Sequence, residues 1–129
     1  MDVNYLGKDE IIAINKEVVQ ISGDPHGVIS EANLGHAVEA VKFKYNSEPD
    51  KIILKAAFLM QQLANKAHAF IEGNKRTAET ATIAFLNING AHFEERDQQA
   101  LTDFVLSVAR NEQSLTTTAK WLKKRTAFD

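Results

Sequence analysis

The feature that most constrains the fold of this chain is the spacing of its apolar residues, which follows a helical period along most of the sequence. The first such segment is ended by Gly23-Asp24-Pro25, and Pro49 marks another break in the period. No long run of alternating apolar and polar residues indicates a strand. The sequence therefore predicts an all-α bundle of about six helices, with at most a small hairpin near residues 42–50. The first helix is expected to bury one stripe of apolar side chains, formed by Ile11, Ile14, Val18 and Ile21.

Capping and breaking residues separate the other expected helices. Ser30 is a suitable N-cap for a second helix. A third helix begins at Lys51 and ends close to His68, and it is apolar nearly all round, as is typical of the buried centre of a domain. A fourth helix follows Gly73 and ends at Asn89-Gly90. Two further helices are expected, one carrying Leu101, Phe104, Val105 and Val108 and the other beginning at Ser114.

Size and composition narrow the classes of protein that this chain can represent. Its 129 residues suffice for one domain, spanning residues 1–129, and are too few for two. The net charge of −2 argues against a protein that coats nucleic acid, so no direct nucleic-acid binding is expected. The absence of cysteine excludes disulfides, thiolate zinc sites and a cysteine nucleophile. No apolar run could span a bilayer and no secretory signal is visible, so we expect a soluble cytoplasmic protein with no membrane partner.

The stretch from His68 to Arg76, His-Ala-Phe-Ile-Glu-Gly-Asn-Lys-Arg, gathers groups that phosphoryl or nucleotidyl transfer requires. If a helix begins near Asn74, its first N–H groups and its dipole form an anion site. Gly73 has no side chain to keep a phosphate at a distance. Lys75 adds a compact positive charge, and Arg76 adds a planar fork that suits two phosphate oxygens.

Two other side chains of this stretch are suited to the chemistry itself. Glu72 is a carboxylate beside basic residues, an arrangement that commonly holds Mg²⁺. The imidazole of His68 could take the proton from an attacking hydroxyl. Phe70 would anchor the loop to the core. Capping and surface pairing also explain each residue singly, but their convergence within one short stretch favours a functional site.

The stretch also resembles the signature His-x-Phe-x-(Asp/Glu)-Gly-Asn-x-Arg of the Fic/Doc family. It departs from that signature at Ala69, where many Fic proteins have proline. The resemblance extends over roughly residues 5–125, and its Gly-Asn-Lys-Arg run is most similar to the Doc toxins of toxin–antitoxin systems. The matching positions are His68, Phe70, Glu72, Gly73, Asn74 and Arg76.

The resemblance implies a role for each matched residue. His68 would be the general base that acts on a hydroxyl of a target protein, and Glu72 would bind Mg²⁺. Phe70 would be structural, and the segment Lys42–Asp50 would form the flap that the family places beside the nucleotide. The phosphates of ATP would be held by the turn and the start of the following helix, which are Gly73, Asn74, Lys75 and Arg76.

Two departures from the pattern of Fic adenylyltransferases favour the Doc branch. Those enzymes usually have a second glycine and a second arginine where this chain has Lys75 and Glu79. Glu79 would repel a γ-phosphate. The resemblance therefore implies a toxin that transfers the γ-phosphate of ATP to a Ser or Thr hydroxyl of a protein, as Doc does with translation elongation factor Tu. A Fic-type adenylyltransferase (AMPylation) and a non-catalytic phosphate-binding module are the alternatives.

Control by a separate protein is expected from an absence in the sequence. Many Fic proteins restrain themselves with a helix bearing (Ser/Thr)-x-x-x-Glu-(Gly/Asn), but no Ser or Thr of this chain has Glu four residues later. The resemblance to Doc implies instead an antitoxin protein that binds in a groove of the toxin. The three histidines outside the motif show no metal-ligand spacing and are expected to be surface or capping residues; they are His26, His36 and His92.

Overall fold

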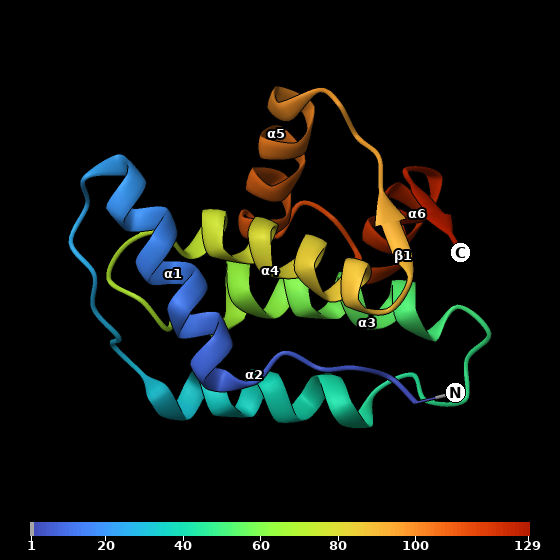
Figure 1. Ribbon diagram of the computed structural model, residues 1–129, viewed down its shortest axis with the longest axis horizontal. Helices are drawn as coiled ribbons and strands as arrows, with labels where there is room; N and C mark the ends of the chain where they lie inside the picture. Colours follow the sequence, from blue (N-terminus) through green and yellow to red (C-terminus); the bar gives the residue numbers. More distant parts are fainter. Residues whose placement is uncertain (1) are drawn as a thin grey trace.

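The computed structural model describes residues 2–129, which form six α-helices, one π-helical turn and a small two-stranded sheet (Figure 1). The prediction of an all-α bundle of about six helices is confirmed. Within residues 2–129, no helix combines the length and the apolar character that crossing a membrane requires. The helices are α1 (Lys8–Ser22), α2 (Glu31–Phe43), α3 (Lys51–Gln61), α4 (Asn74–Ile88), α5 (Gln98–Ala109) and α6 (Leu115–Lys124).

Helices α3 and α4 lie side by side in the middle of the molecule, and the other helices surround them (Figure 1). The prediction that the third helix is the buried centre is confirmed, because its side chains from Lys55 to Met60 are all buried. Fully buried alanines on both helices permit a close approach of the two axes. They are Ala56 and Ala57 on α3, and Ala78 and Ala81 on α4.

The expected helix ends are confirmed by their capping contacts. The side chains of Ser30 and Ser114 accept hydrogen bonds from the backbone N–H groups three residues later, at the starts of α2 and α6. Gly23 ends α1 with a φ of 77°, in the left-handed region that favours glycine. Asn89 follows the last residue of α4.

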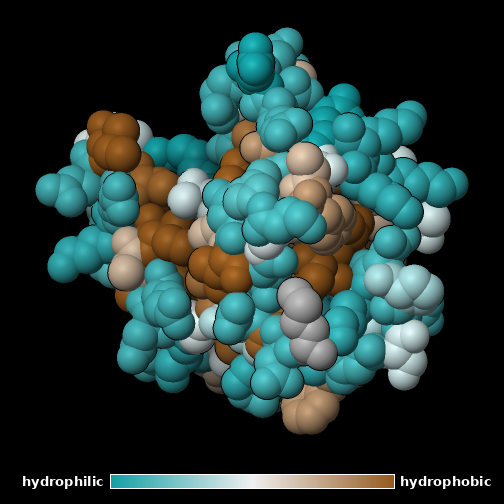
Figure 2. All heavy atoms as spheres, turned by 45° about the vertical axis from the view of Figure 1, so that its right-hand side comes forward, coloured by the Kyte–Doolittle hydropathy of each residue, from teal (hydrophilic) through white to brown (hydrophobic). Residues whose placement is uncertain are grey.

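The buried face of α1 differs from the expected stripe. Ile11 is fully buried, but Ile21 is 80% exposed. The buried positions of α1 are instead Ile11, Asn15 and Val19, four residues apart, so a polar residue lies in the middle of the helix's inner face. Elsewhere the surface is mainly hydrophilic, with apolar residues gathered toward the middle of the face drawn in Figure 2.

A π-helical turn, η1 (Gln62–Lys66), continues α3 toward the motif. Its hydrogen bonds join residues that are five positions apart, such as the bond from the Ala67 N–H to the Gln62 carbonyl at 2.7 Å. The chain leaves the helix at His68, whose φ is 45°. The end of the third helix near His68 was predicted, whereas the π turn was not.

The small sheet pairs β1 (Ala91–Phe93) with β2 (Thr126–Phe128) in antiparallel register. The hairpin expected near residues 42–50 is wrong in position, because that segment contains the end of α2 followed by bends and turns. The buried Lys55 ammonium draws this segment together, donating to the carbonyls of Val41 and Lys44 at 2.7 Å each. These bonds satisfy carbonyls at the C-terminal end of α2, where a positive charge is favourable.

Candidate active site

The stretch from His68 to Gly73 connects the π turn to α4, and His68 lies at its exposed beginning. The backbone before it is held by Asn33, whose Nδ2 donates to the Ala67 carbonyl at 3.0 Å. A positive φ is uncommon for a residue other than glycine, and it turns the chain sharply at His68. His68 lies at the junction of helix and loop, as expected, and it is exposed to solvent.

An extended segment of the α1–α2 connection runs antiparallel to this loop. Val28 forms a β-bridge with Phe70. It is flanked by backbone bonds from Ile71 N–H to the Gly27 carbonyl at 3.1 Å and from Ile29 N–H to the Ala69 carbonyl at 2.7 Å. Phe70 is only 2% exposed, so it occupies the core position that an anchor requires.

The expectation that Lys42–Asp50 lies beside the motif as a flap is wrong. That segment precedes α3, whereas the motif follows the π turn. Residues 51–66 separate them by roughly 20–24 Å at the rise of a helix. Figure 1 shows the two connections at opposite ends of α3. The segment that does lie beside the motif is the one around Val28.

Gly73 precedes the first residue of α4, which begins at Asn74 as predicted. Its φ of 80° is a conformation that glycine adopts without strain. A Cβ on this residue would lie 2.8 Å from Cγ1 of Val19 and 3.2 Å from Nδ2 of Asn15. Glycine is thus required both by the turn and by the close approach of α1 to the loop.

Asn74 braces the loop through both ends of its side-chain amide. Its Nδ2 donates to the Phe70 carbonyl at 2.8 Å, and its Oδ1 accepts from the Phe70 N–H at 3.1 Å. These bonds fix the shape of the loop between the imidazole and α4. This bracing role was not foreseen, and it stands beside the phosphate contact expected of the same residue.

The N-terminus of α4 has no side-chain cap, whereas the side chains of Ser30, Asp97 and Ser114 cap α2, α5 and α6. Its first N–H groups are therefore available to an anion, which the helix dipole also favours. Lys75 lies in this first turn and is exposed. That an anion binds at these positions stays a prediction from the sequence.

The guanidinium of Arg76 is turned toward the end of α1. It donates to the Asp24 carboxylate at 2.9 Å and to the Val18 carbonyl at 3.2 Å, and it also donates to the Ser22 hydroxyl. Hydrogen bonds from Ser22 and then from Arg76 lower the pKa of Asp24 below its ordinary value. Arg76 thus satisfies groups at the C-terminal end of α1, a contact that the sequence analysis did not predict.

Glu79 connects α4 to α5. Its Oε1 accepts from Nε2 of Gln98 at 2.9 Å and from the hydroxyl of Thr102 at 3.5 Å. Burial raises the pKa of Glu79, and the two hydrogen bonds partly offset that rise. The position is therefore occupied by an interhelical contact with α5.

Asn15 is a residue of the site that the sequence analysis missed. It is fully buried, and its Nδ2 donates to the Glu72 carbonyl at 2.9 Å and to the Thr77 hydroxyl at 3.0 Å. Its Oδ1 lies 3.0 Å from Nδ1 of His26. The signal in the sequence is a polar residue spaced four from Ile11 on an otherwise apolar helix face.

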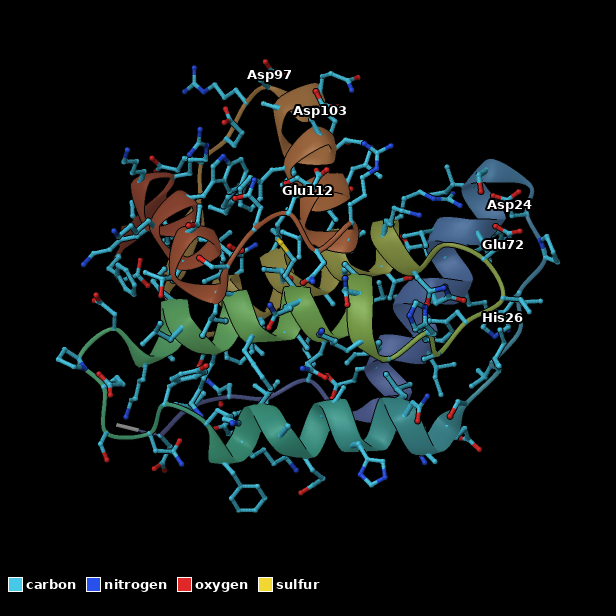
Figure 3. The ribbon with its side chains drawn as sticks, turned by 180° about the vertical axis from the view of Figure 1, so that it is seen from behind. Asp24, His26, Glu72, Asp97, Asp103 and Glu112 are labelled. Atoms are coloured by element: carbon cyan, nitrogen blue, oxygen red, sulfur yellow. The ribbon has the colours of Figure 1, made fainter. Side chains whose placement is uncertain are left out.

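The Glu72 side chain is exposed, and no ion pair within residues 2–129 engages it. Figure 3 shows Asp24, His26 and Glu72 at the same end of the molecule. The described residues contain no group of three or more His, Asp or Glu side chains arranged to hold a metal ion. A single free carboxylate fits Mg²⁺, which usually binds one or two carboxylates and takes its other ligands from phosphate and water.

The comparison with protein families agrees with this geometry. The model of the Fic/DOC family matches residues 5–86, which include α1, the segment paired with the loop, and the whole motif. No curated protein matches the chain. Because the match spans more than half of the sequence and contains the site described above, the chain belongs to the Fic/DOC family.

Proposed function

We propose that this protein transfers the γ-phosphate of ATP to a Ser or Thr hydroxyl of a protein target. Members of the Fic/DOC family are typically transferases. One observation carries the proposal: a single braced loop joins an exposed imidazole, at His68, to the uncapped N-terminus of α4. A proton acceptor and an anion site on either side of one short loop are what transfer from a polyphosphate to a hydroxyl requires.

In this mechanism the residues of the chain bind and orient the phosphates and remove one proton. The first N–H groups of α4 hold phosphate oxygens, and Lys75 neutralises part of their charge. His68 accepts the proton of the target hydroxyl as that oxygen attacks the γ-phosphorus, and the bond from the γ-phosphorus to the β–γ bridging oxygen breaks, so that ADP leaves. Asn74 keeps the loop rigid, so the imidazole and the anion site keep a fixed position relative to each other. Glu72 would hold Mg²⁺, which when bound neutralises charge on the phosphates.

The kinase reaction is favoured over adenylylation by the environment of Glu79. Its carboxylate is bonded to Gln98 and Thr102 of α5, one turn along α4 from the anion site. A negative side chain at that position disfavours the orientation of ATP in which a second arginine neutralises the γ-phosphate. The alternative orientation, with the γ-phosphate toward His68, avoids this repulsion.

The resemblance of the Gly-Asn-Lys-Arg run to Doc supports a proposal for the target and for the control of the reaction. We propose elongation factor Tu as the substrate protein and a separate antitoxin as the inhibitor. A short neighbouring reading frame that encodes a DNA-binding antitoxin would support this setting. Expression of the wild type is then expected to arrest growth, and His68→Ala is expected to relieve the arrest.

The experiment uses ATP labelled at either the α- or the γ-phosphate, with purified elongation factor Tu as the acceptor protein. We expect label transfer from the γ-position only, and none with His68→Ala. Transfer from the α-position alone would reject the kinase and favour an adenylyltransferase. Absence of transfer from both, with equal growth effects of wild type and variant, would favour a non-catalytic binding module.

A further inference from the structure

His26 and Glu72 lie at the end of the pairing that brings the α1–α2 connection against the motif loop. The bridge joins Val28 to Phe70, and the next backbone bond joins Gly27 to Ile71. His26 precedes Gly27 and Glu72 follows Ile71, so each residue lies one position beyond the last backbone bond of this pairing. Both side chains are exposed, and both appear at the same end of the molecule in Figure 3.

The buried carboxamide of Asn15, on α1, contacts both of these residues. Its Nδ2 donates to the backbone carbonyl of Glu72 at 2.9 Å, and its Oδ1 is 3.0 Å from Nδ1 of His26. The backbone bond between Ile71 and Gly27 and this carboxamide thus hold His26 and Glu72 beside the same buried residue.

The hydrogen bonds of Asn15 also determine which nitrogen of His26 carries the proton. Both hydrogens of the Asn15 amide are used, one on Glu72 and the other on Thr77. Its Oδ1, which faces His26, can only accept, so Nδ1 of His26 must be the donor. In the neutral ring, Nε2 is therefore left with a free lone pair.

Metal-binding histidines share this arrangement. Such a histidine usually donates its other ring N–H to a buried acceptor, which fixes the tautomer and the ring orientation. We propose that Nε2 of His26 is a second protein ligand of the divalent cation that Glu72 holds. The inference rests on the cation of the proposed function and assigns to His26 a role that its spacing in the sequence did not indicate.

The donor set of His26 and Glu72 has a consequence for the choice of metal. Imidazole nitrogen suits transition metals, whereas Mg²⁺ prefers oxygen ligands. The site is therefore expected to gain affinity for Mn²⁺ from His26 and to gain little for Mg²⁺. A site built from Glu72 alone would show no such dependence on the histidine.

The experiment measures Mn²⁺ binding to the nucleotide-free protein by isothermal titration calorimetry, for the wild type, His26→Ala, Glu72→Gln and His36→Ala. His36 is the matched control, because it is an exposed histidine on α2. We expect His26→Ala and Glu72→Gln to weaken Mn²⁺ binding by about tenfold or more. His36→Ala should bind Mn²⁺ as the wild type does, and the Mg²⁺ affinity of His26→Ala should change less than about twofold.

Wild-type affinity for Mn²⁺ in His26→Ala would overturn the inference, and so would the absence of any Mn²⁺ binding by the wild type at millimolar concentration. Nitrogen-15 spectra of the imidazole rings give a second readout, in which neutral His26 should carry its proton on Nδ1. A proton on Nε2 would equally contradict the proposal. Failure of γ-phosphate transfer, with Mn²⁺ binding that still depends on His26, would count against the proposed function and leave this site in place.

Discussion

The guanidinium of Arg76 donates to the carboxylate of Asp24 at 2.9 Å, joining the first turn of α4 to the chain just after α1. Arg76 is also the motif residue expected to bind phosphate. A carboxylate and a phosphate are both strong acceptors for a guanidinium, so Asp24 competes with the nucleotide for the same donors.

Replacement of this carboxylate is expected to tighten nucleotide binding. Asp24→Asn removes the competing charge, and we expect the Kd for ATP to fall by about two- to fivefold. Glu17→Gln, the same change of charge at an exposed position of α1, should leave the Kd unchanged. Fluorescence titration with a labelled ATP analogue measures both. An unchanged or higher Kd for Asp24→Asn would mean that Arg76 serves only to hold α1 against α4.

Substitution of the exposed imidazole should remove activity without unfolding the protein. His68→Asn retains a residue that tolerates the positive φ of 45° at this position. We expect the rate of phosphate transfer to fall by about 10²-fold or more, because the proton acceptor is lost. The free energy of unfolding should stay within about 0.5 kcal/mol of the wild type. His36→Asn on α2 should retain full activity, and a wild-type rate for His68→Asn would exclude His68 as the base.

Two glycine substitutions should have opposite effects on stability. Gly73→Ala places a Cβ at a φ of 80° and 2.8 Å from Val19, so we expect a loss of about 1–3 kcal/mol in the free energy of unfolding. Gly35→Ala lies within α2 and has open space around the new Cβ, so a gain of about 0.5–1 kcal/mol is expected. Urea unfolding measures both. Equal effects of the two substitutions would contradict the strained turn before α4.

The pH dependence of stability should carry a contribution from Glu79. Burial raises its pKa in the folded state above the ordinary 4.5. The folded protein therefore binds this proton more tightly than the unfolded chain does. The contribution of Glu79 is fully present below about pH 4.5 and is lost as the pH rises through the raised value.

Glu79→Gln removes this loss of stability at higher pH, because glutamine is neutral at every pH and its Oε1 can still accept from Gln98. At pH 7 we expect the variant to be more stable than the wild type by less than about 1 kcal/mol, since the side chain is partly exposed. At pH 4 the difference should vanish. Urea unfolding at the two pH values tests this, with the exposed Glu94→Gln as control. A variant less stable than the wild type at pH 7 would show that the hydrogen bonds outweigh the burial.

The sequence was sufficient to predict the helices and the position of the candidate site along the chain. Both depend on local signals: the apolar period of each helix, the caps at Ser30 and Ser114, and the motif before Asn74. These signals act within a few residues, so they can be recognised without knowledge of the tertiary structure.

The sequence was not sufficient to predict contacts between segments that lie far apart in the chain. The pairing of Val28 with Phe70 and the bond of Arg76 to Asp24 join residues more than 40 positions apart. The role of Asn15 depends on the same packing, because its partners lie on the motif loop and α4. The small sheet also escaped prediction, since strands as short as Ala91–Phe93 and Thr126–Phe128 carry almost no alternating pattern.

Because of the π turn at Gln62–Lys66, the structure after it depends on the exact number of residues in this turn. A π turn accommodates one residue more than an α-helical turn of the same height. A chain lacking one residue there could wind an uninterrupted α-helix, and the backbone beyond it would emerge rotated by about 100°. The direction in which the His68 side chain points thus depends on the number of residues in the preceding turn. The insertion or deletion of a single residue in that turn should therefore disturb the site far more than a substitution there.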